Sequence, residues 1–291
     1  MTVSRVWALN YDAESELAGA VTARMPLIDR PPWIARGEPV LGEELLARPG
    51  GAAPGSGSGD SEEGALGVAW CPTPRALAAL HAAGIERLVK APDASILKAA
   101  NARETFAYVH PLAAFGAVVA CDVEGVERAV GRAAPERPSG RAPAWLLRRS
   151  LGAAGQGRLL AEGWTEEVDA WVERALPFGP VHVMPYVDIE EEFSAHAFLH
   201  QDGRVELGQH VRQVVRGAAW VSATRRERPI QELADTLGHV VERLRSMGYF
   251  GPLGVDGFVW RDASGARCVA AGTDVNARYT MSMGAGFRDV P

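Results

Sequence analysis

The chain has 291 residues, of which 47% are hydrophobic and 23% charged, so it is long and apolar enough for one large or two to three small folded domains. A formal net charge of −6 without basic blocks argues against a nucleic-acid partner. No stretch approaches the roughly 18 apolar residues of a membrane span, and we expect neither a signal peptide nor a membrane partner. Three widely spaced cysteines predict a reducing compartment, and hence the cytoplasm.

The first third of the chain predicts a small parallel α/β unit. Short apolar strands are expected at 5–10, 67–71 and 85–89. Thr73, followed by proline, supplies the start of a helix between the last two strands. A Gly/Ser-rich stretch at 50–64 has almost nothing to bury and predicts a mobile loop.

Residues 98–108 have helix-forming character and begin at Lys98, one of two lysines in the chain. Further along, an apolar strand from residue 145 enters a loop with Gly152, Gly155 and Gly157, and a strand pattern resumes at Arg158. Glycines let backbone N–H groups approach phosphate oxygens without a Cβ clash. The loop is not of the GxxxxGK[ST] kind, and an ordinary hairpin turn is the alternative.

An apolar strand is expected at 181–187, after a helix at 164–176. Four acids follow it, and they indicate either a ligand site or a solvated turn: Asp188, Glu190, Glu191 and Glu192. The next strand, 193–199, leads through an Asp-Gly hairpin turn into another at 205–215.

The strands at 193–215 carry three histidines, His196, His200 and His210, without the short spacings of a zinc site, so we expect them at the sheet surface. Arg212 is a candidate contact for a substrate carboxylate or a γ-phosphate. A long amphipathic helix then covers 230–247.

The C-terminal stretch predicts a β-hairpin with strands at 255–260 and 267–275. Asp274 and Asn276 share one face, and a bend at Gly272 would bring Asp256 of the partner strand close. Two carboxylates and an amide oxygen are hard ligands suited to Mg²⁺. Arg278, two residues further, is a candidate phosphate contact.

These stretches together resemble the ATP-grasp superfamily. The resemblance covers about 98–281, with the glycine loop, the acid-rich linker and the Asp-x-Asn-x-Arg end in the family's order. It implies an α+β fold in which two subdomains with antiparallel sheets grip ATP, preceded by a small α/β domain. The corresponding boundaries are 1–97, 98–183 and 184–291.

The resemblance also implies roles for individual residues. Lys98 and Arg148 would contact the ATP phosphates, under the loop formed by Gly152, Gly155 and Gly157. The linker of Met184, Tyr186 and Val187 would hold adenine, and Glu191 or Glu192 the ribose hydroxyls. Asp256, Asp274 and Asn276 would hold Mg²⁺.

The implied activity is an ATP- and Mg-dependent ligase that joins a small carboxylate to an amine through an acylphosphate, with Arg278 and Arg212 as catalytic cations. Three positions depart from the family pattern, since Arg148 replaces Lys, Met184 replaces Glu and Asp274 replaces Glu. The alternatives are therefore a non-catalytic ATP-binding protein and a small-molecule kinase on the same fold. The sequence leaves the oligomeric state open, a homodimer included.

Overall fold

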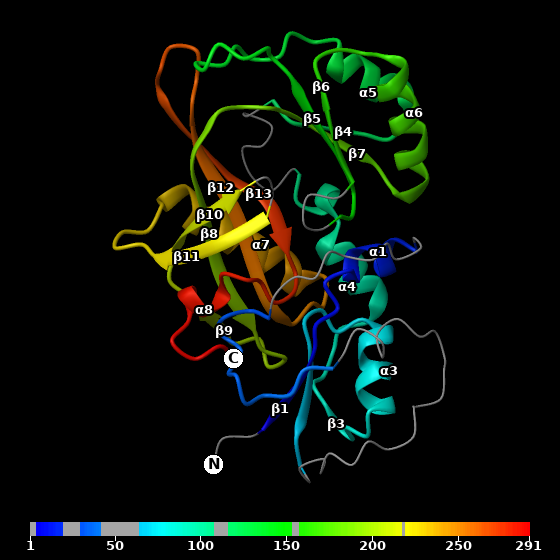
Figure 1. The fold of residues 1–291 in the computed structure, drawn as a ribbon, viewed down its shortest axis with the longest axis vertical. Coiled ribbons are helices and arrows are strands. Elements are labelled where there is room, and N and C mark those ends of the chain that lie inside the picture. The colour runs from blue at the N-terminus through cyan, green and yellow to red at the C-terminus, as the bar shows by residue number, and fades with distance from the viewer. Residues whose placement is uncertain (1–3, 20–29, 42–63, 108–115, 153–156, 217–218) are drawn as a thin grey trace.

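Three sheets follow one another along the long axis of the molecule (Figure 1). The computed structural model describes residues 4–19, 30–41, 64–107, 116–152, 157–216 and 219–291. The helices are α1 (Ala13–Ala18), α3 (Pro74–Ala82), α4 (Ala94–Asn101), α5 (Val123–Val130), α6 (Glu166–Ala175), α7 (Gln231–Ser246) and α8 (Met283–Gly286), with 3-10 turns η1 (Arg103–Thr105) and η2 (Leu176–Phe178). Among the described residues, none of the helices combines the length and apolar character that a membrane span needs.

The first sheet is the predicted parallel unit. Its strands β1 (Arg5–Ala8), β2 (Leu66–Ala69) and β3 (Arg87–Leu88) lie in that order, and both pairings are parallel. The Thr73 side chain caps α3 by accepting a hydrogen bond from the Ala76 amide, as the sequence indicates. The predicted loop at 50–64 lies outside the described residues, except for its last residue.

The second sheet is antiparallel, with the order β4-β7-β5-β6. Its strands are β4 (Val118–Ala120), β5 (Trp145–Arg149), β6 (Arg158–Ala161) and β7 (Val181–Pro185). Helices α5 and α6 cover one face, where Val126 and Val172 are fully buried against the strands (Figure 1). The other face is turned toward the third sheet.

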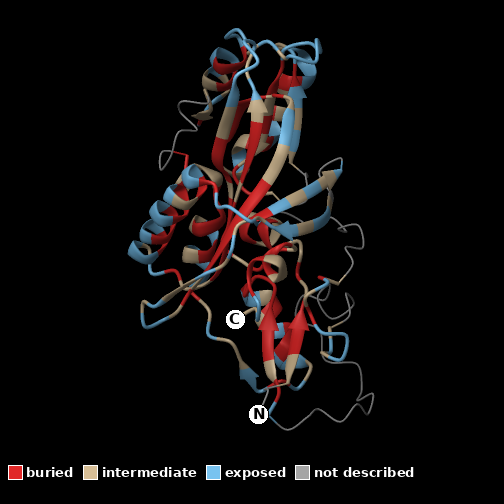
Figure 2. Ribbon diagram, turned by 90° about the vertical axis from the view of Figure 1, so that its left-hand side faces the viewer, coloured by how far each residue is buried: buried red, intermediate tan, exposed pale blue. Residues whose placement is uncertain are grey.

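The third sheet has the order β11-β10-β8-β12-β13, with β9 beside β8, and all its pairings are antiparallel. Its strands are β8 (Ile189–Leu199), β9 (Val205–Leu207), β10 (Val211–Arg216), β11 (Ala219–Arg225), β12 (Gly251–Arg261) and β13 (Arg267–Asn276). The amphipathic α7 packs its Leu233 and Leu244 against Phe193 and Leu199 of β8. Figure 2 shows that buried residues run through the strands while the outer face of the helix is exposed. The face of the sheet opposite α7 carries the polar side chains described below.

Two sequence predictions are wrong at this level. The helix expected over 98–108 ends at Asn101, because Ala102 is extended and the side-chain Nδ2 of Asn101 donates to the Leu97 carbonyl at 2.9 Å. His196 is not at the sheet surface. It is fully buried and lies 3.0 Å from the Ser282 hydroxyl.

The three sheets follow the order of the three predicted domains. The predicted boundary at 97/98 falls inside α4, and the boundary at 183/184 falls inside β7. Each predicted boundary thus lies a few residues before the end of the helix or strand that it divides. The division into separate domains stays a prediction.

Candidate functional site

A bulge in the β12–β13 hairpin sets the geometry of the site. Asp256 lies opposite Asp274, whereas Gly257 lies opposite Ala271, so two extra residues of β13 are accommodated between these pairs. One of them, Gly272, has a φ of +74°, and a Cβ there would lie 2.8 Å from the Thr236 methyl group. The predicted bend at Gly272 is thus present, and it brings the two carboxylates to one face of the hairpin.

Asn276 completes an oxygen-rich cluster with these carboxylates. Its Nδ2 donates to Asp256 Oδ2 at 2.9 Å, and Gln213 Nε2 donates to Asp256 Oδ1 at 3.0 Å. Burial first, and then the charge of Asp274, raise the pKa of Asp256 to about 6. Within the described parts of the chain, no three His, Cys, Asp or Glu side chains gather around a metal-sized space, so this candidate Mg²⁺ set consists of two carboxylates and one amide oxygen.

Two arginines from other elements converge on Asp274. Arg103 of η1 donates to Asp274 Oδ2 at 3.2 Å, and Arg148 Nη1 of β5 lies 3.9 Å from the same oxygen. Arg148 Nη2 also donates to the Thr273 carbonyl at 2.6 Å, which ties the second sheet to the third. Burial acting alone would raise the pKa of Asp274, but the Arg103 and Arg148 guanidinium groups hold that pKa below its ordinary value.

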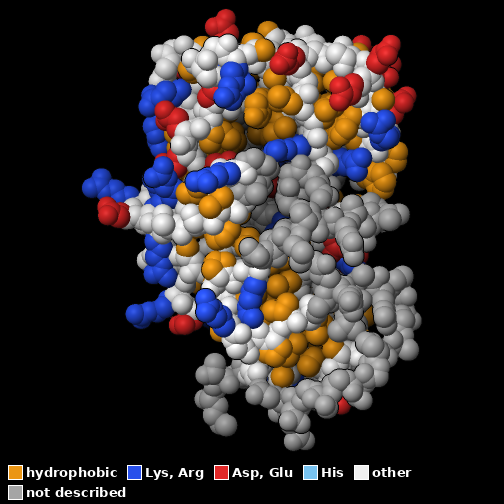
Figure 3. All heavy atoms as spheres, viewed as in Figure 1, with side chains coloured by type: hydrophobic (Ala, Val, Ile, Leu, Met, Phe, Trp, Pro, Cys, Tyr) orange, Lys and Arg blue, Asp and Glu red, His pale blue; other side chains and the backbone are white. Residues whose placement is uncertain are grey.

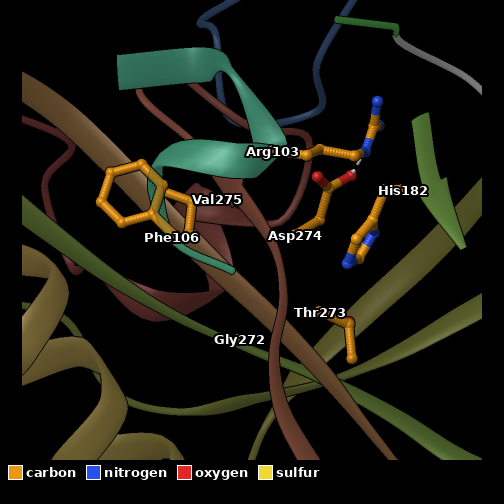
Figure 4. Close-up of a pocket in the computed structure, with 7 residues that line it drawn as sticks. All are labelled: Arg103, Phe106, His182, Gly272, Thr273, Asp274 and Val275. Carbon is orange, nitrogen blue, oxygen red and sulfur yellow. Dashed lines mark hydrogen bonds and ion pairs between the residues drawn. The ribbon is translucent and has the colours of Figure 1, made fainter. Parts of the chain in front are cut away.

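A small pocket opens beside these groups (Figure 4). It is lined by Arg103, Phe106, His182, Gly272, Thr273, Asp274 and Val275. Burial, and then the charge of Arg148, lower the pKa of His182 to about 3, so the ring is neutral at physiological pH. His182 Nδ1 lies 3.0 Å from Arg148 Nη2.

Several buried nitrogen atoms around this pocket have no hydrogen-bond partner among the described residues. They are the Nε atoms of Arg103 and Arg148 and the Nε2 atom of His182. Buried polar groups are nearly always paired in folded proteins. An unpaired set of cationic and neutral donors fits a ligand rich in anionic oxygens, such as a chain of phosphates.

The predicted adenine linker lies where the second and third sheets meet. Met184 and Val187 are buried in a small apolar cluster with Phe258 and Ala270. Apolar surroundings of this kind suit a purine ring, with backbone groups left to read its edge. Tyr186 lies outside the cluster, under the Arg137 guanidinium at 4.7 Å from the ring centre.

The two candidate ribose acids lie on opposite faces of β8. The acids Glu190 to Glu192 belong to β8 instead of a solvated turn. Glu192 lies opposite Gln213 and two residues from Ser194, the partner of Asp256, so Glu192 is on the site face. Burial, and then the charge of Asp256, raise the pKa of Glu192. Glu191 points to the other face, where it pairs with Arg226.

Other predicted residues are not brought to the cluster. Arg212 lies opposite Phe193 on the α7 face, and its side chain is 61% exposed. Figure 3 shows basic side chains along the side of the molecule where β10 and β11 lie. Lys98 is exposed on α4, and Arg278 pairs with Glu14 of α1 at 2.5 Å.

The glycine-rich loop is described only at its two ends. Gly152 offers its carbonyl to Arg103 at 2.8 Å. Gly157 has a φ of +68° and closes the β5–β6 turn by accepting a hydrogen bond from the Arg149 amide. Gly155 lies outside the described residues, so its predicted phosphate contact stays a prediction.

Three residues at the site were missed from the sequence: Arg103, His182 and Gln213. Arg103 carried a usable signal, because a chain with two lysines must fill most cationic roles with arginine, and Arg103 lies five residues after Lys98. The other two sit in strand patterns that give no indication of which face they occupy.

Comparison with known proteins supports the fold. No family model and no curated protein matches this sequence. Among solved structures, N5-carboxyaminoimidazole synthetase from Staphylococcus aureus in complex with ADP is similar, with a TM-score of 0.53 and 10% identity over 97% of this chain and 73% of that chain. A second structure of the Staphylococcus aureus synthetase gives a TM-score of 0.50 and 12% identity over 97% of this chain and 74% of that chain. The chain has the ATP-grasp fold that its motifs resemble.

Proposed function

We propose that this protein is an ATP- and Mg-dependent ligase that joins a carboxylate to an amine through an acylphosphate. The observation that carries the proposal is the oxygen cluster of Asp256, Asp274 and Asn276 beside the unpaired Nε donors of Arg103 in η1 and Arg148 in β5. An ATP-grasp fold with that arrangement supports triphosphate binding. The ADP bound by the similar synthetase is consistent with it.

In this proposal each side chain has a defined task. Asp256, Asp274 and Asn276 would hold Mg²⁺, which neutralises phosphate charge when bound. When ATP binds, Arg103 and Arg148 turn from the Asp274 carboxylate to phosphate oxygens. In the free protein Asp274 neutralises these two guanidinium groups, so they are held ready for the phosphates without being exposed to water. Glu192 accepts hydrogen bonds from the ribose hydroxyls, and the cluster of Met184, Val187 and Phe258 covers the base.

The chemistry needs no protein nucleophile. A substrate carboxylate oxygen attacks the γ-phosphorus, the bond from that phosphorus to the bridging oxygen breaks, and ADP leaves. An amine nitrogen then attacks the acyl carbon, phosphate leaves, and the nitrogen loses a proton. The protein supplies alignment and electrostatic stabilisation, which are the main sources of rate in phosphoryl transfer.

The deciding experiment measures ADP and phosphate release with MgATP and pooled carboxylates and amines. A ligase releases both products only when both substrate classes are present. A kinase would consume ATP without free phosphate and form a stable phosphoester. A non-catalytic binder would gain thermal stability with MgATP and release nothing.

Asp274→Ala should abolish turnover and leave the fold intact. Asp262→Ala is the matched control, because Asp262 lies at the other end of the same hairpin, in the turn between β12 and β13. Unchanged turnover in Asp274→Ala would refute the role of that carboxylate.

A further inference from the structure

A buried carboxylate oxygen close to the proposed site lacks a partner. Glu14 of α1 is 5% exposed, and its Oε1 accepts a hydrogen bond from Arg278 Nε at 2.5 Å. Its Oε2 is buried and has no hydrogen-bond partner among the described residues. Leaving an ionised oxygen desolvated and unpaired is costly, so a donor is expected from a bound molecule.

Glu14 lies where ligands of parallel sheets bind. β1 and β2 run parallel, and Glu14 follows the carboxyl end of β1 while Cys71 follows that of β2. Small molecules bind outside the carboxyl ends of parallel strands because the loops there leave a crevice. The chain beyond β13 reaches the same edge, since the Tyr279 amide donates to the Trp70 carbonyl at 3.0 Å.

Arg278 connects this edge to the oxygen cluster. It is two residues beyond Asn276, its side chain is only 13% exposed, and it lies within electrostatic reach of both Glu14 and Asp274. The segment is fixed in place by the Ala277 amide, which donates to Asn101 Oδ1 at 3.0 Å. The Arg278 guanidinium thus lies between two places. On one side is Glu14 Oε2, which has no hydrogen-bond donor among the described residues, and on the other is the place where the ATP phosphates would lie.

We propose that Glu14 and Arg278 form the subsite for the carboxylate substrate, and that this substrate is an amino acid. Its ammonium group donates to Glu14 Oε2, and its carboxylate lies beside Arg278, directed toward the Asp274 side of the site. The inference deepens the proposed function and rests on it for the fate of that carboxylate. A substrate that has a carboxylate but no ammonium group would leave Glu14 Oε2 unpaired.

Binding separates this inference from turnover. The protein, with Mg²⁺ and a hydrolysis-resistant ATP analogue, is titrated with three pools: amino acids, the same carbon skeletons without the amino group, and amines without a carboxylate. We expect calorimetric binding that depends on Glu14 from the first pool and no binding from the second, while any binding of the third pool should be independent of Glu14. Glu14→Gln should weaken amino-acid binding about tenfold or more, because a hydrogen bond between two charged groups is lost, while affinity for the ATP analogue is unchanged.

Glu16→Gln is the matched control, since Glu16 lies on the same helix but pairs with Arg75 of α3. It should leave amino-acid affinity unchanged. If Glu14→Gln does not fold, Glu14→Asp, which keeps the charge but shortens the reach, should weaken binding in the same direction. Equal binding of the des-amino acids, absence of amino-acid binding, or indifference to substitution of Glu14 would each overturn the subsite.

The two proposals can fail separately. Amino-acid binding that depends on Glu14, without phosphate release under any substrate combination, would support the subsite and contradict the ligase. Phosphate release with des-amino acids but not amino acids would support the ligase and contradict the subsite.

Discussion

Asp256→Asn should make the protein more stable and inactive at once. Moving the pKa of Asp256 from 3.8 to about 6 means that its ionised form destabilises the folded state by about 3 kcal/mol. Asparagine keeps the shape and one accepting oxygen and removes the charge that opposes Asp274, and the side-chain amide of Asn276 or Gln213 turns to offer its oxygen to the new NH2 group. We expect a gain of about 1–3 kcal/mol in the free energy of unfolding near pH 8, which raises the melting temperature by about 2–5 °C for a chain of this length.

The sign of the pH dependence is part of the prediction. Because the folded protein holds this proton more tightly than the unfolded chain does, the penalty is absent below the ordinary pKa and fully present above about pH 6. The stability difference between variant and wild type should therefore grow as pH rises. Thermal unfolding without nucleotide from about pH 4 to about pH 8 measures it.

Adding MgATP should make the wild type more stable than Asp256→Asn, which reverses the order of their melting temperatures. The wild type gains stability by binding, whereas the variant has lost a proposed metal ligand and gains little. A variant that is less stable than the wild type, or a difference that does not change with pH, would refute the electrostatic reasoning. A variant with full turnover would refute the metal role of Asp256.

Three further substitutions test other parts of the site. Arg148→Ala should raise the KM for ATP about tenfold or more by removing a phosphate contact, while Arg148→Lys should retain more affinity than alanine does; equal kinetics of all three proteins would contradict the assignment. Gly272→Ala should destabilise the fold by about 1–3 kcal/mol in urea unfolding, because the new methyl group would sit on a backbone with positive φ and lie 2.8 Å from Thr236. Gly265 is the control, since it also has a positive φ, +81°, but has open space around it. Gly265→Ala should cost about 1 kcal/mol. Glu192→Gln should raise the KM for ATP and erase the preference for ATP over 2′-deoxy-ATP, and Glu191→Gln should do neither; the reverse pattern would move the ribose to the other face.

Local patterns in the sequence were sufficient for much of the fold. The Thr73 cap, the Asp-Gly turn between β8 and β9 and the long α7 each depend on neighbours in sequence, and each is present. The bend at Gly272 was predictable because a glycine in a strand pattern marks a bulge. The alignment of Asp256 with Asp274 followed from it.

Contacts between distant segments were not predictable. Arg103 meets Asp274 across 171 residues, and Arg278 meets Glu14 across 264. No periodicity or spacing encodes such pairs, so the sequence placed Arg278 at the phosphates and gave no role to Glu14. The face of β10 was also ambiguous, because a strand exposes alternate residues and a shift of one position exchanges Arg212 for Gln213.

The central claim is most directly tested by locating the metal in a crystal structure with Mg²⁺ and a hydrolysis-resistant ATP analogue. The account predicts Mg²⁺ within about 2.1 Å of side-chain oxygens of Asp256, Asp274 and Asn276. Arg103 and Arg148 should then have turned from Asp274 to the phosphates. A metal without ligands from the β12–β13 hairpin, or a nucleotide bound elsewhere, would contradict it.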